Sequence, residues 1–349
     1  MKKILFVGTI SLLTVGQVNQ PLPILANDIE TVILAKKPQV KPQVKPQIKP
    51  QPQPVYSEKI EVINLGSEPR IPLRFTPVIN TTEKVKMTFN MKMEMSLQGN
   101  SFPSPKMPNM IFTVESIVTK IENNGNIHFK VTFTDVEITP TEDVPKEVVE
   151  TMQKQFKKVV GMGGTFVINN KGKYISGNFD LPKSFDSGMG DITGQLSQSL
   201  QQMSAIVPEE SLGIGAKWTV TENFDSSLFN LKQTANYELV SLKDGIATVN
   251  VTIDQNADKQ EFKLPGFSQK NNDFRLMLNS LKSTGKGNME MSFYRLLPMS
   301  ANISINTDME SQMTMNFKIP KQKGKPQKNE NLEMLMNMKQ TIDLTIKSD

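Results

Sequence analysis

The chain has 349 residues, a formal net charge of +5 and no cysteine. Without cysteine it has no disulfide, no thiolate metal site and no thiol for lipid attachment. The basic excess lies within residues 1–54, and the rest of the chain is electrically balanced, which argues against the clustered positive surface that nucleic-acid binding requires.

The N-terminus has the pattern of an export signal. Residues 1–3 are basic, and residues 4–15 form an apolar run shorter than the roughly twenty residues that span a bilayer. We expect a signal peptide over residues 1–26, cleaved after Ala26, with Ala35 as a second candidate, because the peptidase needs a small residue. The mature protein is then expected in the periplasm, secreted or at the cell surface, without a lipid anchor.

Residues 27–54 are expected to form a disordered, proline-rich linker. Between Lys37 and Pro54 the unit Lys-Pro-Gln-Val recurs, and proline at every fourth position excludes both helix and sheet. An extended polyproline II spacer is expected instead. Either it is a plain tether, or its regularly spaced lysines contact an anionic surface of the cell envelope.

Residues 55–349 are expected to form a single β-rich domain. The alternative is that this domain consists of two pseudo-repeated halves. The hydrophobic period is mostly two, and residues 85–97 alternate strictly between apolar and polar. Turn sequences at Asn123–Gly125, Asn169–Gly172 and Lys243–Gly245 separate pairs of strands. About eleven strands are expected, near residues 85–97, 110–122, 127–133, 165–168, 173–179, 218, 235–242, 246–253, 287–293, 303–319 and 334–346.

Two segments have the pattern of a helix with one apolar face. One follows Pro145 and places Val148, Met152, Phe156 and Val159 on one face; the other follows Asp191 with Ile192, Leu196, Leu200 and Met203. Residues 273–281 are a weaker candidate. The expected fold class is mainly β (α+β): a large curved antiparallel sheet, or unclosed half-barrel, with two or three covering helices.

Two segments carry a resemblance to known proteins. They are Pro-Glu-Glu-Ser-Leu-Gly-Ile-Gly-Ala-Lys-Trp over residues 208–218, and the strand Gly-Lys-Gly-Asn-Met-Glu-Met-Ser-Phe over residues 285–293. On these motifs the chain resembles a family of exported, functionally uncharacterised bacterial proteins. Its layout is similar to the LolA/LppX type of lipoprotein and lipid carrier, which implies an unclosed half-barrel with helices plugging its mouth. A shared fold does not transfer an activity.

Methionine is concentrated on the apolar faces of the expected strands. Flexible, polarizable thioethers suit an adaptable apolar pocket, ordinary core packing and the ligation of Cu(I). We expect a cavity that holds a lipid or acyl chain; the alternatives are an envelope structural or interaction protein with a filled core, and copper handling. The expected lining residues are Met87, Phe89, Met91, Met93, Met95, Met313, Met315, Met334, Met336, Met338 and Trp218, with a core anchor as the other interpretation of Trp218.

Catalysis is not expected, and neither is a cofactor or a metal. The sole histidine, His128, is out of phase with its apolar neighbours and should face solvent. The chain has no cysteine, no second histidine and no Gly-x-Ser-x-Gly motif, so residues that the usual nucleophilic triads require are missing. Asp135 and Glu137 are expected to be solvated, and Gly161–Gly164 follows a helix and therefore ends it instead of cradling a phosphate.

Overall fold

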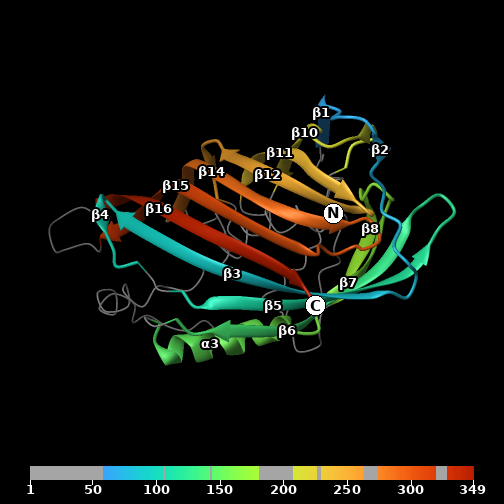
Figure 1. Ribbon diagram of the computed structural model, residues 1–349. Coiled ribbons are helices and arrows are strands. Elements are labelled where there is room, and N and C mark those ends of the chain that lie inside the picture. Colours follow the sequence, from blue (N-terminus) through green and yellow to red (C-terminus); the bar gives the residue numbers. More distant parts are fainter. Residues whose placement is uncertain are drawn as a thin grey trace, which may run out of the picture.

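A large antiparallel sheet makes up most of the computed structural model (Figure 1). The structure describes residues 58–104, 107–141, 144–180, 207–225, 229–262, 274–319 and 328–349. The strands are β1 (Glu58–Asn64), β2 (Ile71–Pro72), β3 (Thr82–Leu97), β4 (Asn100–Ser101), β5 (Asn109–Ile121), β6 (Ile127–Thr139), β7 (Gly163–Ile168), β8 (Tyr174–Asp180), β9 (Ser211–Leu212), β10 (Lys217–Asp225), β11 (Asn230–Lys243), β12 (Ile246–Ala257), β13 (Gln260–Glu261), β14 (Phe274–Ser292), β15 (Ser300–Ile319) and β16 (Lys328–Ser348).

The main sheet has 14 strands and is unclosed. Their order is β1-β10-β11-β12-β14-β15-β16-β3-β5-β6-β7-β8, with β13 paired to β14 and β4 paired to β3. Within the described part of the chain, the strands at the two ends of this order, β1 and β8, do not pair with each other. A separate two-stranded sheet joins β2 to β9. The prediction of a mainly β fold with a large unclosed sheet is therefore confirmed.

The expected hairpins are confirmed at their turns. Gly125, Gly172 and Gly245 have φ angles of 85°, 97° and 73°, in the left-handed region that glycine adopts at least cost. They join β5 to β6, β7 to β8 and β11 to β12. The sheet also contains β1, β4 and β13, which alternation did not predict. β4 and β13 have 2 residues each, too few to display a period, and β1 directly follows the proline-rich segment.

The helix expected after Pro145 is confirmed as α3 (Lys146–Phe156), which continues into a 3-10 turn, η2 (Lys157–Val159). Its packed face is rotated relative to the prediction: Val149, Met152 and Phe156 pack against the core, whereas Val148 is exposed. Gly161 follows with a φ of 87°, as expected for a residue that ends a helix.

The prediction of a helix over residues 273–281 is wrong, because residues from Phe274 onward belong to β14. Phe274, Leu276 and Leu278 are spaced by two, and β13 and β15 supply backbone partners to this segment. The helix predicted after Asp191 lies outside the described residues. Among the described residues, α3 is the one α-helix.

The helix α3 covers the part of β6 that extends beyond its neighbour β7 (Figure 1). There, the Gln153 Oε1 atom accepts a hydrogen bond from the Ile138 N–H at 2.8 Å, and its Nε2 atom donates to the Val136 carbonyl at 2.7 Å. Phe156 adds an edge-to-face contact with Phe112, with ring centroids 5.8 Å apart. One side-chain amide therefore satisfies backbone groups that a further strand would otherwise pair.

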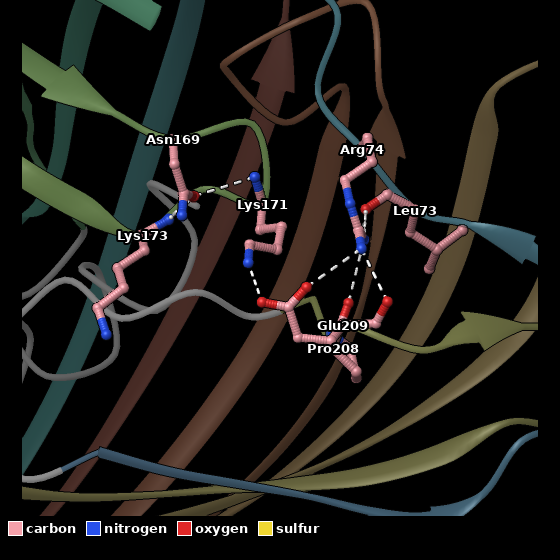
Figure 2. A network of polar contacts seen from close by, with 7 residues as sticks. All are labelled: Leu73, Arg74, Asn169, Lys171, Lys173, Pro208 and Glu209. Atoms are coloured by element: carbon pink, nitrogen blue, oxygen red, sulfur yellow. Dashed lines mark hydrogen bonds and ion pairs between the residues drawn. The ribbon is translucent and has the colours of Figure 1, made fainter. Parts of the chain in front are cut away.

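At one end of the main sheet, side chains join the turn between β7 and β8 to the segments that flank the separate β2–β9 sheet (Figure 2). Lys171, in the turn between β7 and β8, forms an ion pair with Glu209, which lies just before β9. The Glu209 carboxylate also lies 3.5 Å from the Arg74 guanidinium. Arg74 donates hydrogen bonds to the carbonyl oxygens of Leu73, Pro208 and Glu209 at 2.8, 3.1 and 2.8 Å. We call this network the clasp, and the end of the sheet that carries it the proximal end.

The largest part of the hydrophobic core lies on one face of the sheet, next to the clasp. On this inner face, Trp218 stacks on Tyr237 with ring centroids 5.3 Å apart, and both side chains are buried. Gly287 allows β14 and β15 to approach closely, because a Cβ atom there would lie 2.2 Å from the Asn302 carbonyl oxygen. We call this part of the inner face the proximal core.

Candidate functional site

A row of polar side chains crosses the inner face perpendicular to the strands. Six neighbouring strands, β10, β11, β12, β14, β15 and β16, each contribute one polar residue that points to the inner face. Each of these residues lies directly opposite the one on the neighbouring strand. The register continues to Glu58 in β1 and to Met93 in β3. We call this set the polar row: Glu222, Gln233, Gln255, Ser283, Thr307 and Gln340.

Hydrogen bonds link neighbouring members of the polar row, all of which are buried. Gln255 Nε2 donates to Gln233 Oε1 at 2.7 Å, and Gln233 Nε2 donates to Glu222 Oε2 at 3.2 Å. The hydroxyl groups of Ser283 and Thr307 share a hydrogen bond of 2.8 Å. These contacts offset the free-energy cost of removing polar groups from water.

Two residues of the proximal core interact directly with members of the polar row. Gln340 Nε2 donates a hydrogen bond to the thioether sulfur of Met91 at 3.2 Å. Burial, and secondarily the negative charge of Glu222, raise the pKa of Tyr237 well above its ordinary value. Tyr237 is therefore a neutral phenol across the physiological range.

The polar row separates the apolar side chains of the inner face into two clusters. The proximal core lies on one side of it. On the other side is a smaller group, which we call the distal cluster, with Met93, Met95 and Leu276 packed against it. Its buried members are Phe229, Leu231, Ala257, Phe262, Leu278, Leu281, Met309 and Met338.

The residues predicted to line one cavity are divided by this row. Met87, Phe89, Met91 and Trp218 are buried in the proximal core, so the core-anchor interpretation describes the position of Trp218. Met93 lies at the level of the row and contacts both clusters. The others lie beyond the row, where Met338 is buried and Met95, Met313, Met315, Met334 and Met336 are half-buried. With Met309, we call the members beyond the row the distal methionines: Met95, Met309, Met313, Met315, Met334, Met336 and Met338.

The register brings several distal methionines side by side. Met95 in β3 pairs with Met338 in β16, which pairs with Met309 in β15. Farther from the row, Met313 pairs with Met334. Side chains that lie directly opposite on neighbouring strands have Cβ atoms about 5 Å apart. On β3, β15 and β16 the distal part of the inner face is therefore rich in thioether groups.

A buried carboxylate holds the proximal end together. Glu83 is 2% exposed, and its two carboxylate oxygens accept hydrogen bonds from the N–H groups of Leu296 and Leu297 at 2.7 and 2.5 Å. These leucines belong to the connection between β14 and β15. The arrangement gives Glu83 a structural role in closing the proximal core.

The acidic and histidine side chains singled out from the sequence lie elsewhere. His128 is out of phase with the buried Ile127 and Phe129, as expected, and is half-buried at 2.8 Å from Glu122 Oε1. Hydrogen bonds from His128, then from Asn126 and Lys120, lower the pKa of Glu122 to about 2.

Asp135 and Glu137 on β6 are exposed. Among the described residues, no three histidine or acidic side chains are grouped as a metal site would require. In the same part of the chain, no helix combines the length and the apolar character needed to cross a membrane.

The strands that carry the polar row belong to the C-terminal part of the chain. Residues 181–349 match DUF6263, a family of unknown function. The matched residues include β9 to β16, and thus every member of the polar row and most of the distal methionines. No curated protein matches the sequence.

Solved structures give matches of low similarity. Salmonella typhi OmpF in complex with daunomycin is 7% identical, with a TM-score of 0.21, over 75% of this chain and 98% of that chain. Pseudomonas aeruginosa OpdL is 6% identical, with a TM-score of 0.16, over 76% of this chain and 99% of that one. Acinetobacter baumannii OccAB4 is 7% identical, with a TM-score of 0.17, over 80% of this chain and all (100%) of that one. TM-scores of this size do not establish a common fold.

Proposed function

We propose that this protein is an exported, non-catalytic binding protein that holds a hydrophobic ligand, a lipid or an acyl chain, against the distal methionines. The observation that supports this most is the contrast across the polar row. The methionines of the proximal core are buried, whereas Met95, Met313, Met315, Met334 and Met336 remain half-exposed on the same face.

The chemistry of the distal surface supports an apolar ligand of variable shape. Burial of apolar surface contributes about 25 cal/mol per Å², whatever the exact shape of the ligand. Unbranched thioether side chains can repack around different ligands, which is why methionine is frequent on adaptable binding surfaces. The unclosed sheet also agrees with the layout that the resemblance to lipid carriers of the LolA/LppX type implies. In this proposal residues 27–54 tether the domain to the cell envelope.

Native mass spectrometry of the protein isolated from its own cells tests this proposal. We expect a copurifying lipid or other hydrophobic molecule that is lost on denaturation. A ligand-free protein that also fails to bind a hydrophobic probe in vitro would favour the alternative, an envelope structural or interaction protein.

Charges placed on the distal surface should weaken the binding of a hydrophobic probe. We expect the double substitution Met313→Lys and Met334→Lys to reduce the affinity for N-phenyl-1-naphthylamine at least about tenfold, because the ammonium groups would have to lose water when the ligand is bound. Fluorescence titration measures this.

A matched control is available on the other face of the same sheet. Met277 in β14 is half-buried and lies between the inward residues Leu276 and Leu278 along the strand. Met277→Lys introduces the same side chain on the outer face and should leave probe affinity within about twofold of wild type. Equal losses in the two variants would contradict the proposed site.

A second candidate function, Cu(I) handling, is favoured by one observation. Met95, Met338 and Met309 pair in succession across three neighbouring strands, and thioethers are ligands for Cu(I). Titration with Cu(I) under reducing conditions distinguishes the candidates: tight binding that is lost in Met338→Leu supports copper, whereas its absence leaves the hydrophobic ligand.

A further inference from the structure

Ser311 places a lone hydroxyl group within the distal apolar surface. Its side chain is 0% exposed, and its Oγ atom has no hydrogen-bond partner among the described residues. Leu278 and Met336 lie directly opposite it on the neighbouring strands. Met309 and Met313 are the next inward residues along β15. A buried hydroxyl group without a partner costs about 1–3 kcal/mol, so this position is unfavourable unless a ligand completes it.

Ser311 is separate from the polar row. It lies four residues beyond Thr307 on β15, a separation of about 13 Å along a strand. Thr307 already shares a hydrogen bond with Ser283. Unlike the hydroxyl groups of Ser283 and Thr307, that of Ser311 has no hydrogen bond within the described part of the chain to exchange for one to a ligand. Because Ser311 is 0% exposed, a ligand reaches it where the flexible methionine side chains around it move aside.

The charges of the inner face restrict the class of that ligand. At the inward positions of β3, β10, β11, β12 and β14, of β15 as far as Met315 and of β16 from Leu332 onward, the side chains that the structure describes include the carboxyl groups of Glu83 and Glu222 but no lysine or arginine. An anionic head group would find no cation here, and its desolvation would be uncompensated. A neutral ligand fits this electrostatic environment.

We propose that the distal surface binds a neutral acyl ester, with Ser311 Oγ donating a hydrogen bond to the ester carbonyl oxygen and the hydrocarbon on either side lying against the distal methionines. This proposal rests on the proposed function and specifies its ligand. A carbonyl oxygen flanked by two alkyl chains matches a hydroxyl group that is surrounded by apolar side chains on both neighbouring strands and along its own. A fatty acid or a phospholipid places its charge where this surface offers no partner.

Competition against bound N-phenyl-1-naphthylamine tests the proposal with three probes of similar size: octyl octanoate, hexadecane and palmitate. We expect octyl octanoate to bind wild type more tightly than palmitate. Ser311→Ala should lower the affinity for octyl octanoate about fivefold, the equivalent of one hydrogen bond, and leave the affinity for hexadecane unchanged. The unliganded variant should not melt below wild type, because the deleted hydroxyl group has no partner to lose.

Ser283→Ala is the matched control, because its hydroxyl group is also buried but is bonded to Thr307. It should lower the melting temperature and retain the wild-type preference for the ester. If the naphthylamine probe binds but Ser311→Ala leaves octyl octanoate affinity unchanged, or palmitate binds as tightly as the ester, the ester proposal is overturned while the proposed function stands. If neither the naphthylamine probe nor any of the three competitors binds, the proposed function itself fails.

Discussion

Replacing Gln233 by leucine should lower the free energy of unfolding by about 3 kcal/mol. Gln233 accepts a hydrogen bond from Gln255 and donates one to Glu222 in the buried polar row. Leucine has nearly the same volume but can do neither, so an amide donor and a carboxylate acceptor each lose this partner without access to water. Urea denaturation followed by the fluorescence of Trp218 measures the change.

Gln312→Leu is the control for this effect. Gln312 lies on β15 and donates a hydrogen bond to Glu333 at the exposed surface, where water can replace the lost partner. We expect a change of about 0.5 kcal/mol or less. If Gln233→Leu were equally mild, the polar row would not be a buried, connected element.

Glu83→Gln should destabilise the protein by a comparable amount, about 3 kcal/mol. The carboxylate of Glu83 accepts two backbone hydrogen bonds at the connection between β14 and β15. Glutamine keeps the size, but its NH₂ group replaces one acceptor and turns a donor toward a backbone N–H group. Thermal unfolding by circular dichroism measures the loss.

Glu94→Gln on the same strand provides the comparison for Glu83. Glu94 is exposed, so the same chemical change should alter stability by no more than about 0.5 kcal/mol. Similar melting temperatures for the two variants would mean that the Glu83 carboxylate does not hold the proximal end.

Much of the fold could be predicted from the sequence because alternation is a local property. The strict pattern of residues 85–97 and the glycine-containing turns at Gly125 and Gly245 specify strands and hairpins without knowledge of their partners. The segment that begins at Phe274 shows the limit. Its spacing is compatible with a short helix, and pairing with β13 and β15 decides in favour of a strand.

The candidate site could be predicted only in part. Alternation places the methionines on one face, but it carries no information on how far each strand is shifted relative to the next. Thr307 interrupts the apolar series between Ile305 and Met309, and Gln340 interrupts it between Met338 and Ile342. Each interruption is visible in the sequence. Their alignment into one row, which separates Met87 from Met336, is a property of strand register.

Methionine oxidation with and without ligand tests most directly whether the polar row divides a closed core from a binding surface. Limited treatment with hydrogen peroxide, followed by peptide mass spectrometry, gives an oxidation rate for each methionine. We expect Met313, Met315, Met334 and Met336 to oxidise much faster than Met87, and bound N-phenyl-1-naphthylamine to slow the first group alone. Equal rates on both sides of the row, or bound ligand that protects neither side, would contradict the division of the inner face.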